Sequence, residues 1–192
     1  MTDYPPVTPE HFDRLYANDP DPWKFATSGY ERDKYAATLA ALPHRRYARA
    51  FEVGCSIGVL TQCLAERCDA ILAADVADAA LQQARLRCHD LPHVQFDRMV
   101  IPQSWPGGVF DLILFSEVLY YLNAADRMAA ARLSLSALLP GGAIILVNWH
   151  GPTDGFCTGD AAAEEMIAAC APALRPVTQQ RMERYRLDVL SA

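Results

Sequence analysis

The chain has 192 residues and a formal net charge of −6, from 17 basic and 23 acidic side chains. Hydrophobic residues make up 52% of it, which excludes a disordered chain and is enough to fill the core of one domain. The acidic balance also argues against a nucleic-acid partner, because such binding needs an excess of positive charge.

No apolar run reaches the roughly 18 to 20 residues that cross a bilayer, and residues Met1 to Pro6 lack the features of an export signal. None of the six cysteines forms a C-x-x-C pair. We therefore expect a cytoplasmic protein with reduced thiols, no membrane association and no metal site.

The first 43 residues predict two helices joined by a loop. One helix should follow Thr8, which precedes a proline at the first helical position. The proline-rich stretch over 19–23 excludes helix. A second helix should begin after Ser28, three residues before a glutamate, and stop at Pro43. We expect residues 1–43 to form a lid over the site.

From Tyr47 onward, short apolar runs alternate with helical segments. The expected strands are 47–53, 70–75, 93–97, 110–116 and 143–149, and the helices between them cover about 57–67, 78–89 and 124–139. The tail predicts a helix over 160–171 and two strands, 176–182 and 184–190, that pair antiparallel. This order predicts an α/β fold: a mostly parallel, seven-stranded sheet with an antiparallel C-terminal pair and helices on both faces.

A glycine loop follows the first expected strand. Gly54 and Gly58 let the chain turn sharply and let a ligand lie against the backbone. The next helix begins with unpaired N–H groups, which suit a carboxylate or a phosphate. Seventeen residues later, Asp75 ends the second strand, where a carboxylate can accept hydrogen bonds from two ribose hydroxyls. Together these features predict a site for an adenosine-containing ligand.

Two other interpretations stay open at this point. The glycines can be plain loop residues, with Asp75 as the cap of the next helix. A nicotinamide cofactor is the second alternative. Against it stand Glu52, Ser56 in the place of the middle glycine, and a chain too short for a second substrate-building unit.

The segment from Glu52 to Gly58 resembles motif I of class I S-adenosylmethionine-dependent methyltransferases, usually acid-x-Gly-x-Gly-x-Gly, and Asp75 matches their ribose-binding acid. Residues 110–119 resemble the fourth strand of that family with the loop beyond it, and 138–142 resemble the proline-glycine turn before its fifth strand. The resemblance covers residues 50–149.

This resemblance implies a single methyltransferase domain over 1–192, with a Rossmann-like core over 47–192. It implies S-adenosyl-L-methionine as the cofactor, S-adenosyl-L-homocysteine as the product, and no metal. Two departures stand out: Ser56 replaces the middle glycine, which requires a negative φ there, and Asp97 comes about three residues too early to hold the adenine amino group. We therefore expect the backbone of Met99 or Val100 to contact adenine.

A narrower resemblance is to the nodulation protein S family of N-methyltransferases. It rests on Asp21-Pro22-Trp23, on Tyr30-Glu31 with Lys34, and on the segment 116–122. It implies methyl transfer to the amine of an amino sugar or oligosaccharide, by a monomer or weak dimer. A small-molecule O-methyltransferase and a relative that has lost the cofactor are the alternatives.

The site residues are expected just beyond the carboxyl ends of the strands, where open α/β sheets bind ligands. Glu117 and His150 are the candidates for a catalytic base; an amine that loses its proton to water needs none. The expected cofactor-binding residues are Tyr30, Lys34, Glu52, Gly54, Cys55, Ser56, Gly58, Asp75, Val76, Met99, Val100 and Ser116. The expected acceptor-binding residues are Trp23, Tyr120, Tyr121 and Trp149.

Each of these assignments has a structural alternative. Tyr30 and Lys34, expected to reach the cofactor's carboxylate, can form a surface pair instead. His150 can be a solvated loop residue, and Glu117 can serve only to orient the cofactor or a loop. Trp23 and the tyrosine pair can be core residues.

Overall fold

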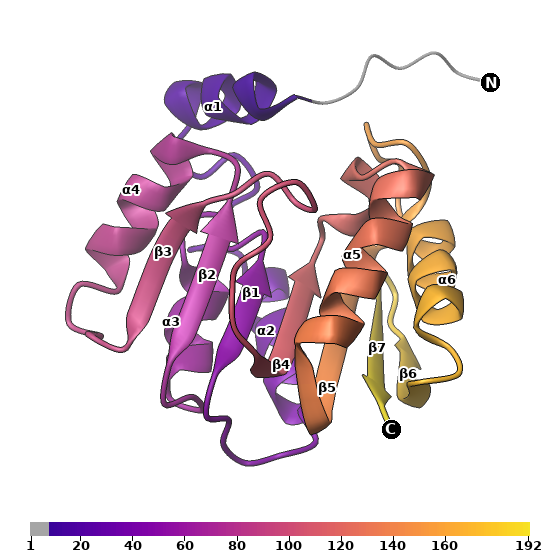
Figure 1. Cartoon of the computed structure of the whole chain (residues 1–192). Coiled ribbons are helices and arrows are strands. Elements are labelled where there is room, and N and C mark those ends of the chain that lie inside the picture. Colours follow the sequence, from indigo (N-terminus) through magenta and orange to yellow (C-terminus); the bar gives the residue numbers. More distant parts are fainter. Residues whose placement is uncertain (1–7) are drawn as a thin grey trace.

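The computed structural model describes residues 8–192. The prediction made for residues Met1 to Pro6 falls outside the described part. From residue 8 onward, the chain builds one seven-stranded sheet with helices on both faces (Figure 1). This confirms the α/β fold class expected from the alternation of apolar runs and helical segments.

Two helices precede the sheet, as predicted. Helix α1 (Pro9–Asn18) begins after Thr8, which has extended backbone angles but makes no capping bond with its side chain. Helix α2 (Gly29–Ala40) begins after Ser28, whose hydroxyl accepts a hydrogen bond from the Glu31 N–H. Between the helices, the Asp21 carboxylate accepts two backbone N–H bonds and fixes the loop.

The strands follow the order β3-β2-β1-β4-β5-β7-β6 across the sheet. Their bounds are β1 Ala50–Val53, β2 Ile71–Asp75, β3 Val94–Arg98, β4 Phe110–Ser116, β5 Leu138–Trp149, β6 Arg175–Arg181 and β7 Tyr185–Ser191. The first five strands pair in parallel, and β7 pairs antiparallel with both β5 and β6. The antiparallel C-terminal pair is therefore confirmed.

The remaining helices lie between the strands. They are α3 Val59–Ala65, α4 Asp78–Arg87, the 3-10 turn η1 Leu119–Tyr121, α5 Ala124–Ala137 and α6 Gly159–Cys170. Helix α5 starts at the predicted cap, because the Asn123 side chain accepts a hydrogen bond from the Asp126 N–H. An apolar run with a polar cap just before it thus marks the start of α5, whereas α3 and α4 follow Gly58 and Ala77, which provide no side-chain cap.

Two strand starts differ from the prediction by three residues or more. Strand β1 begins at Ala50 instead of 47, since Tyr47 makes only an isolated bridge to Cys68. Strand β5 begins at Leu138 instead of 143, because Leu138 already pairs with Phe110. The pairing of β4 with β5 then shifts register at the proline-glycine segment. Residues that were expected to form a turn before β5 therefore form a bulge inside this strand.

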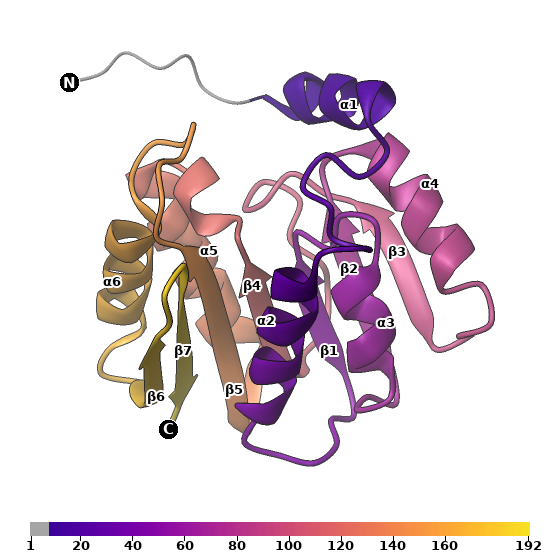
Figure 2. The ribbon, with the colours of Figure 1, turned by 180° about the vertical axis from the view of Figure 1, so that it is seen from behind.

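Each face of the sheet has its own core. Helices α2 and α3 cover one face, and α5 and α6 cover the other (Figures 1 and 2). Alternation along β4 divides its side chains between them: Leu112 and Leu114 belong to the first core, and Ile113 and Phe115 to the second. Both faces of β4 are apolar because both are buried.

Strand order reverses between β1 and β4, since the chain passes from β1 to β2 on one side and returns to β4 on the other. A crevice opens outside the carboxyl ends of such neighbouring strands. Helix α1 lies across this end of the sheet, over α4 (Figure 2). The fold therefore places the end of β1, the end of β4 and α1 around one space.

Candidate functional site

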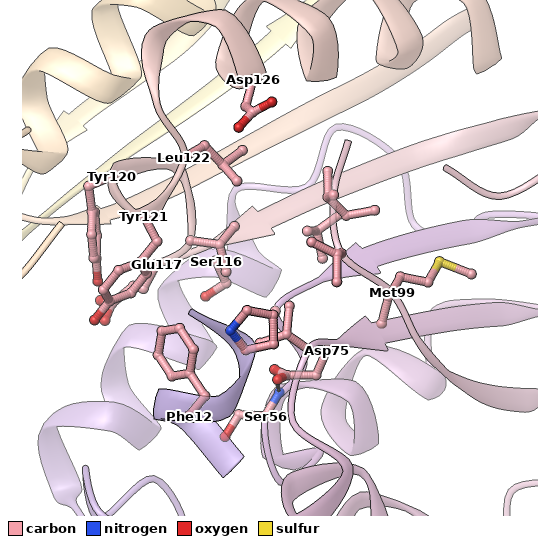
Figure 3. Close-up of a pocket in the computed structure, with 18 of the residues that line it drawn as sticks. Phe12, Ser56, Asp75, Met99, Ser116, Glu117, Tyr120, Tyr121, Leu122 and Asp126 are labelled. Carbon is pink, nitrogen blue, oxygen red and sulfur yellow. Dashed lines mark hydrogen bonds between the residues drawn. The ribbon is translucent and has the colours of Figure 1, made fainter. Parts of the chain in front are cut away.

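A cavity of about 320 Å³ occupies the crevice at the reversal point. Figure 3 shows its labelled walls: Ser56, Asp75 and Met99 lie along one side, and Glu117, Tyr120 and Tyr121 along the other. Phe12 reaches in from α1. Apart from Phe12, these side chains come from the ends of β1, β2, β3 and β4 and the segments that follow them, at the predicted edge of the sheet.

The glycine loop is shaped by two left-handed glycines. Gly54 has φ +81°, and a Cβ atom there would lie 2.0 Å from the Val118 side chain, so no other residue fits without displacing it. Gly58 has φ +78° and precedes the first turn of α3. The loop therefore needs glycine for both backbone angle and space, as its sequence suggested.

The expectation for Ser56 is wrong, because its φ is +51°. Two bonds hold this left-handed conformation. The Ser56 N–H donates to the Asp75 carboxylate at 2.8 Å, and its hydroxyl lies 2.5 Å from the Tyr16 hydroxyl of α1. The serine thus ties helix α1 to the loop, which glycine cannot do.

We expect Ser56→Gly to be more stable than Ser56→Ala by about 1 kcal/mol, because both lose the hydroxyl but only alanine keeps the strain of a positive φ. Urea unfolding of the two variants without cofactor tests this. Equal stabilities, or a more stable alanine variant, would contradict the left-handed conformation.

Asp75 is fixed before any ligand arrives. Its two carboxylate oxygens accept the N–H groups of Ser56 and Ala77, at 2.8 and 3.0 Å. Burial raises the pKa of the Asp75 carboxyl, and these N–H groups offset part of the rise. A carboxylate oxygen has more than one lone pair, so the oriented group can still accept bonds from ribose hydroxyls.

The cavity next to Asp75 is apolar. Val76, Met99 and Val118 line it, and such side chains suit the two faces of a purine ring. Asp97 does not line this cavity; it lies in the surface hollow beside β3. The backbone of Met99 and Val100 therefore remains the predicted contact for adenine.

A second, smaller chamber of about 30 Å³ lies behind the glycine loop. Gly54, Ser56, Ser116 and Glu117 line both spaces. The smaller one adds three predicted residues, which are Lys34, Glu52 and Cys55. It therefore brings the ammonium group of Lys34 together with the carboxyl groups of Glu52 and Glu117.

Glu52 is buried at the end of β1, with 1% of its surface exposed. No residue in the described part donates a hydrogen bond to its carboxylate oxygens. Burial raises the pKa of this carboxyl to about 7, while the Thr61 hydroxyl beside it acts in the opposite direction. An unpartnered buried carboxyl in this chamber fits a ligand that brings a donor group.

We expect Glu52→Gln to remove a pH dependence of stability. Between about pH 5 and 7, the native Glu52 holds a proton that the unfolded chain has lost, so stability falls as pH rises. The Gln variant should escape this loss and gain on the order of 2 kcal/mol over wild type across that range. Urea unfolding at several pH values, with the exposed Glu66→Gln as control, measures it; parallel curves for wild type and Glu52→Gln would contradict the prediction.

Glu117 lies between the chamber and the cavity. It has φ +57°, and its N–H donates to the Val147 carbonyl at 2.7 Å, which fixes its backbone at the end of β4. Lys34 donates to its Oε1 at 2.7 Å. Burial raises the pKa of Glu117, and Lys34 lowers it in part. Glu117 therefore faces the cavity with a carboxyl group that is fixed in place by Lys34 and has a raised pKa.

Aromatic rings surround the cavity near Glu117. Tyr120 and Tyr121 lie side by side, with centroids 4.7 Å apart, and Phe12 meets Tyr121 edge to face at 5.1 Å. Trp23 stacks on Phe25 in the loop between α1 and α2, and both line the cavity. Helix α1 and its loop therefore close the cavity with aromatic side chains.

Four predicted site residues line neither space: Tyr30, Gly58, Trp149 and His150. Tyr30 packs edge to face on Trp149, with centroids 6.3 Å apart. His150 turns toward α6, and its Nδ1 lies 3.3 Å from the Asp160 carboxylate. Of the two predicted bases, the structure brings only Glu117 to the cavity.

Several lining residues were missed by the sequence analysis. They are Pro9, Phe12, Tyr16, Phe25, Val53, Ala74, Ile101, Gln103, Val118, Leu122, Asn123, Asp126 and Phe156. Phe12 and Tyr16 are four residues apart on one face of α1, so helical spacing could have found them. Phe156 carried no such signal, because it lies in the loop between β5 and α6 and is held beside the cavity by a tertiary contact, the bond from its N–H to the Tyr120 carbonyl.

Within residues 8–192, no group of three or more His, Cys, Asp or Glu side chains could hold a metal ion. All six cysteines are free thiols. No helix in the same range is long and apolar enough to cross a membrane.

Comparison with known proteins identifies the family. The model of the family "Nodulation protein S (NodS)" matches residues 11–184. Nodulation protein S of Bradyrhizobium diazoefficiens is 36% identical over 155 residues, which cover 78% of this chain and 72% of the relative.

The chain also resembles solved structures, two of which have clear sequence similarity to it. A putative methyltransferase from Pseudomonas syringae is 36% identical, with a TM-score of 0.75, over 86% of this chain and 100% of the other. The N-methyltransferase NodS from Bradyrhizobium japonicum WM9 is 27% identical, with a TM-score of 0.72, over 84% and 95% of the two chains. The chain therefore belongs to the nodulation protein S family and is an S-adenosylmethionine-dependent methyltransferase.

Proposed function

We propose that this enzyme methylates the amine of an amino sugar or of an oligosaccharide that carries one. The observation behind the proposal is the position of Glu117: its carboxylate borders an aromatic-walled cavity, away from the side where Asp75 would hold the ribose. A carboxylate among aromatic rings attracts an ammonium group. The N-methyltransferase NodS, an enzyme of the same family, supports an amine as the acceptor.

The residues fit the cofactor. Asp75 would accept bonds from the ribose, and the apolar walls around Met99 would hold adenine. The unpartnered Glu52, in the smaller chamber, would face the amino-acid end. When bound, S-adenosylmethionine supplies an activated methyl group, so alignment of the acceptor contributes most of the acceleration.

The protein's own task is to orient the acceptor and remove its proton. As the nitrogen lone pair forms the new N–C bond, the S–C bond of the sulfonium breaks, and one proton leaves the nitrogen. Glu117 is the proposed acceptor of that proton. The aromatic side chains of α1, its loop and η1 would exclude water while this happens.

Helices α1 and α2, within residues 1–43, are the proposed lid. Their contacts favour this role, since Tyr16 bonds the glycine loop and Phe12 meets Tyr121 across the cavity. The proposal gives His150 and Trp149 no direct contact with the acceptor, because they lie against Asp160 and Tyr30 and line neither cavity. The cytoplasmic location, the absence of a nucleic-acid partner and the monomeric or weakly dimeric state stay predictions.

A matched pair of acceptors tests the proposal. A chitin oligosaccharide with one free terminal amine should accept the labelled methyl group, and the fully N-acetylated oligosaccharide of equal length should not, because an amide nitrogen is a poor nucleophile. A small phenol serves as the third acceptor. Label transferred to the phenol alone would instead make the protein an O-methyltransferase.

A further inference from the structure

The ammonium group of Lys34 already has two carboxylate partners. Its ammonium lies 2.7 Å from Glu117 Oε1 and 2.8 Å from Glu31 Oε2, and its side chain is 2% exposed. The rings of Tyr30 and Tyr35 lie 5.3 and 5.8 Å from the same ammonium. A lysine enclosed by two carboxylates and two aromatic rings is already neutralised.

Glu117 borders the cavity while it is bonded to this lysine. Only the Oε1 of Glu117 is bonded to Lys34, and its side chain is 20% exposed, on the border of the cavity. Its left-handed backbone is held by the bond to Val147. One carboxylate oxygen is thus tied to α2, which leaves the other for the cavity.

We propose that Lys34 is a positioning residue, which keeps the Glu117 carboxylate ionised and turned toward the acceptor, and that it does not bind the cofactor's carboxylate. This differs from the role that the sequence analysis gave to Lys34. The inference rests on the proposed function insofar as Glu117 receives the acceptor's proton.

Glu31 opposes Lys34 in this arrangement. Its negative charge favours the protonated form of Glu117, while the positive charge of Lys34 favours the ionised form. The ammonium group of Lys34 thus lies between the carboxyl groups of Glu31 and Glu117. Other titratable groups around Glu117 come from β1, α2 and η1: Glu52, Tyr30, Tyr35, Tyr120 and Tyr121.

The two neighbours therefore predict opposite shifts. Lys34→Met should raise the titration midpoint of Glu117 by roughly one pH unit or more. Lys34→Arg, which keeps the charge, should return the midpoint toward the wild-type value. Glu31→Gln should lower it. A purely structural role for Lys34 predicts no such opposition between the lysine and glutamate variants.

The titration is read by carbon NMR of protein labelled at the glutamate carboxyl carbons, saturated with S-adenosylhomocysteine. The spectrum of Glu117→Gln identifies the signal. Calorimetry of the same variants gives the affinity for S-adenosylhomocysteine, which we expect to change less than about threefold, below 1 kcal/mol. If Lys34→Met fails to fold, the Lys34→Arg and Glu31→Gln variants still carry the test.

Two results would overturn the inference. One is an unchanged Glu117 midpoint in both Lys34→Met and Glu31→Gln. The other is an affinity for S-adenosylhomocysteine that falls tenfold or more in Lys34→Met, since that would make Lys34 a cofactor ligand. Neither measurement needs an acceptor, so a failure of the proposed amine methylation would appear separately, as wild-type enzyme that transfers no label to any amine.

Discussion

Asp75→Ala should weaken the binding of S-adenosylhomocysteine by at least about 100-fold. The carboxylate is expected to accept two ribose hydroxyls, and hydrogen bonds to a charged group contribute roughly 1.5 to 3 kcal/mol each. The variant also releases the N–H of Ser56, which Asp75 holds at 2.8 Å, so the glycine loop loses a fixed point. Calorimetric titration of wild type and variant measures the change.

Asp97→Ala is the matched control for this experiment. Asp97 is an exposed residue of β3, the strand beside the one that Asp75 ends, and it lies in the hollow beside β3 and not in the main cavity. Its removal should leave the affinity within about twofold. If the two variants bind equally well, Asp75 does not hold the ribose, and the adenosine site must lie elsewhere.

The order of the elements could be read from the sequence because both faces of the sheet are buried. Strand β4 is apolar from Leu112 to Phe115, and its predicted and observed bounds agree, 110–116. Strand β1 was predicted three residues too long. Tyr47 is buried like the strand residues, but it makes only an isolated bridge and does not belong to the continuous pairing of the sheet. Hydrophobicity reports burial, while hydrogen-bond pairing sets where a strand begins.

The site was predictable where backbone chemistry dictates it. Only glycine fits at position 54, because its φ is positive and a Cβ atom would collide with the Val118 side chain. Asp75 ends the neighbouring strand. Side-chain orientation was less accessible. Ser56 holds a positive φ through partners 40 and 19 residues away in the chain, Tyr16 and Asp75, and a local pattern carries no trace of such contacts.

The position of His150 could not be predicted from the sequence either. It follows the end of β5 directly, as Glu117 follows the end of β4. Strand position alone made the two residues equal candidates. The antiparallel partner β7 and helix α6 decide between them, because His150 bonds the Arg184 carbonyl through its backbone and faces Asp160 with its ring. Only the tertiary fold separates them.

Glu117→Gln should lower kcat by about 100-fold or more, since a positioned general base contributes roughly 10²- to 10⁴-fold. The amide keeps the size of the side chain and can still bond Lys34, so binding of S-adenosylhomocysteine should change little. Single-turnover transfer of labelled methyl to an amine acceptor measures the chemical step, with the exposed Glu66→Gln as control.

The pH dependence of the methyl-transfer rate tests the same role of Glu117. A base must be ionised to take a proton, so the wild-type rate should fall as pH drops through the pKa of Glu117. Burial raises that pKa, which places the acidic limb above the range of an ordinary glutamate. The limb should vanish in Glu117→Gln, which no longer titrates at this position. A variant that keeps both the wild-type rate and the limb would mean that the amine loses its proton to water before it attacks, and Glu117 would then serve only to attract the ammonium form.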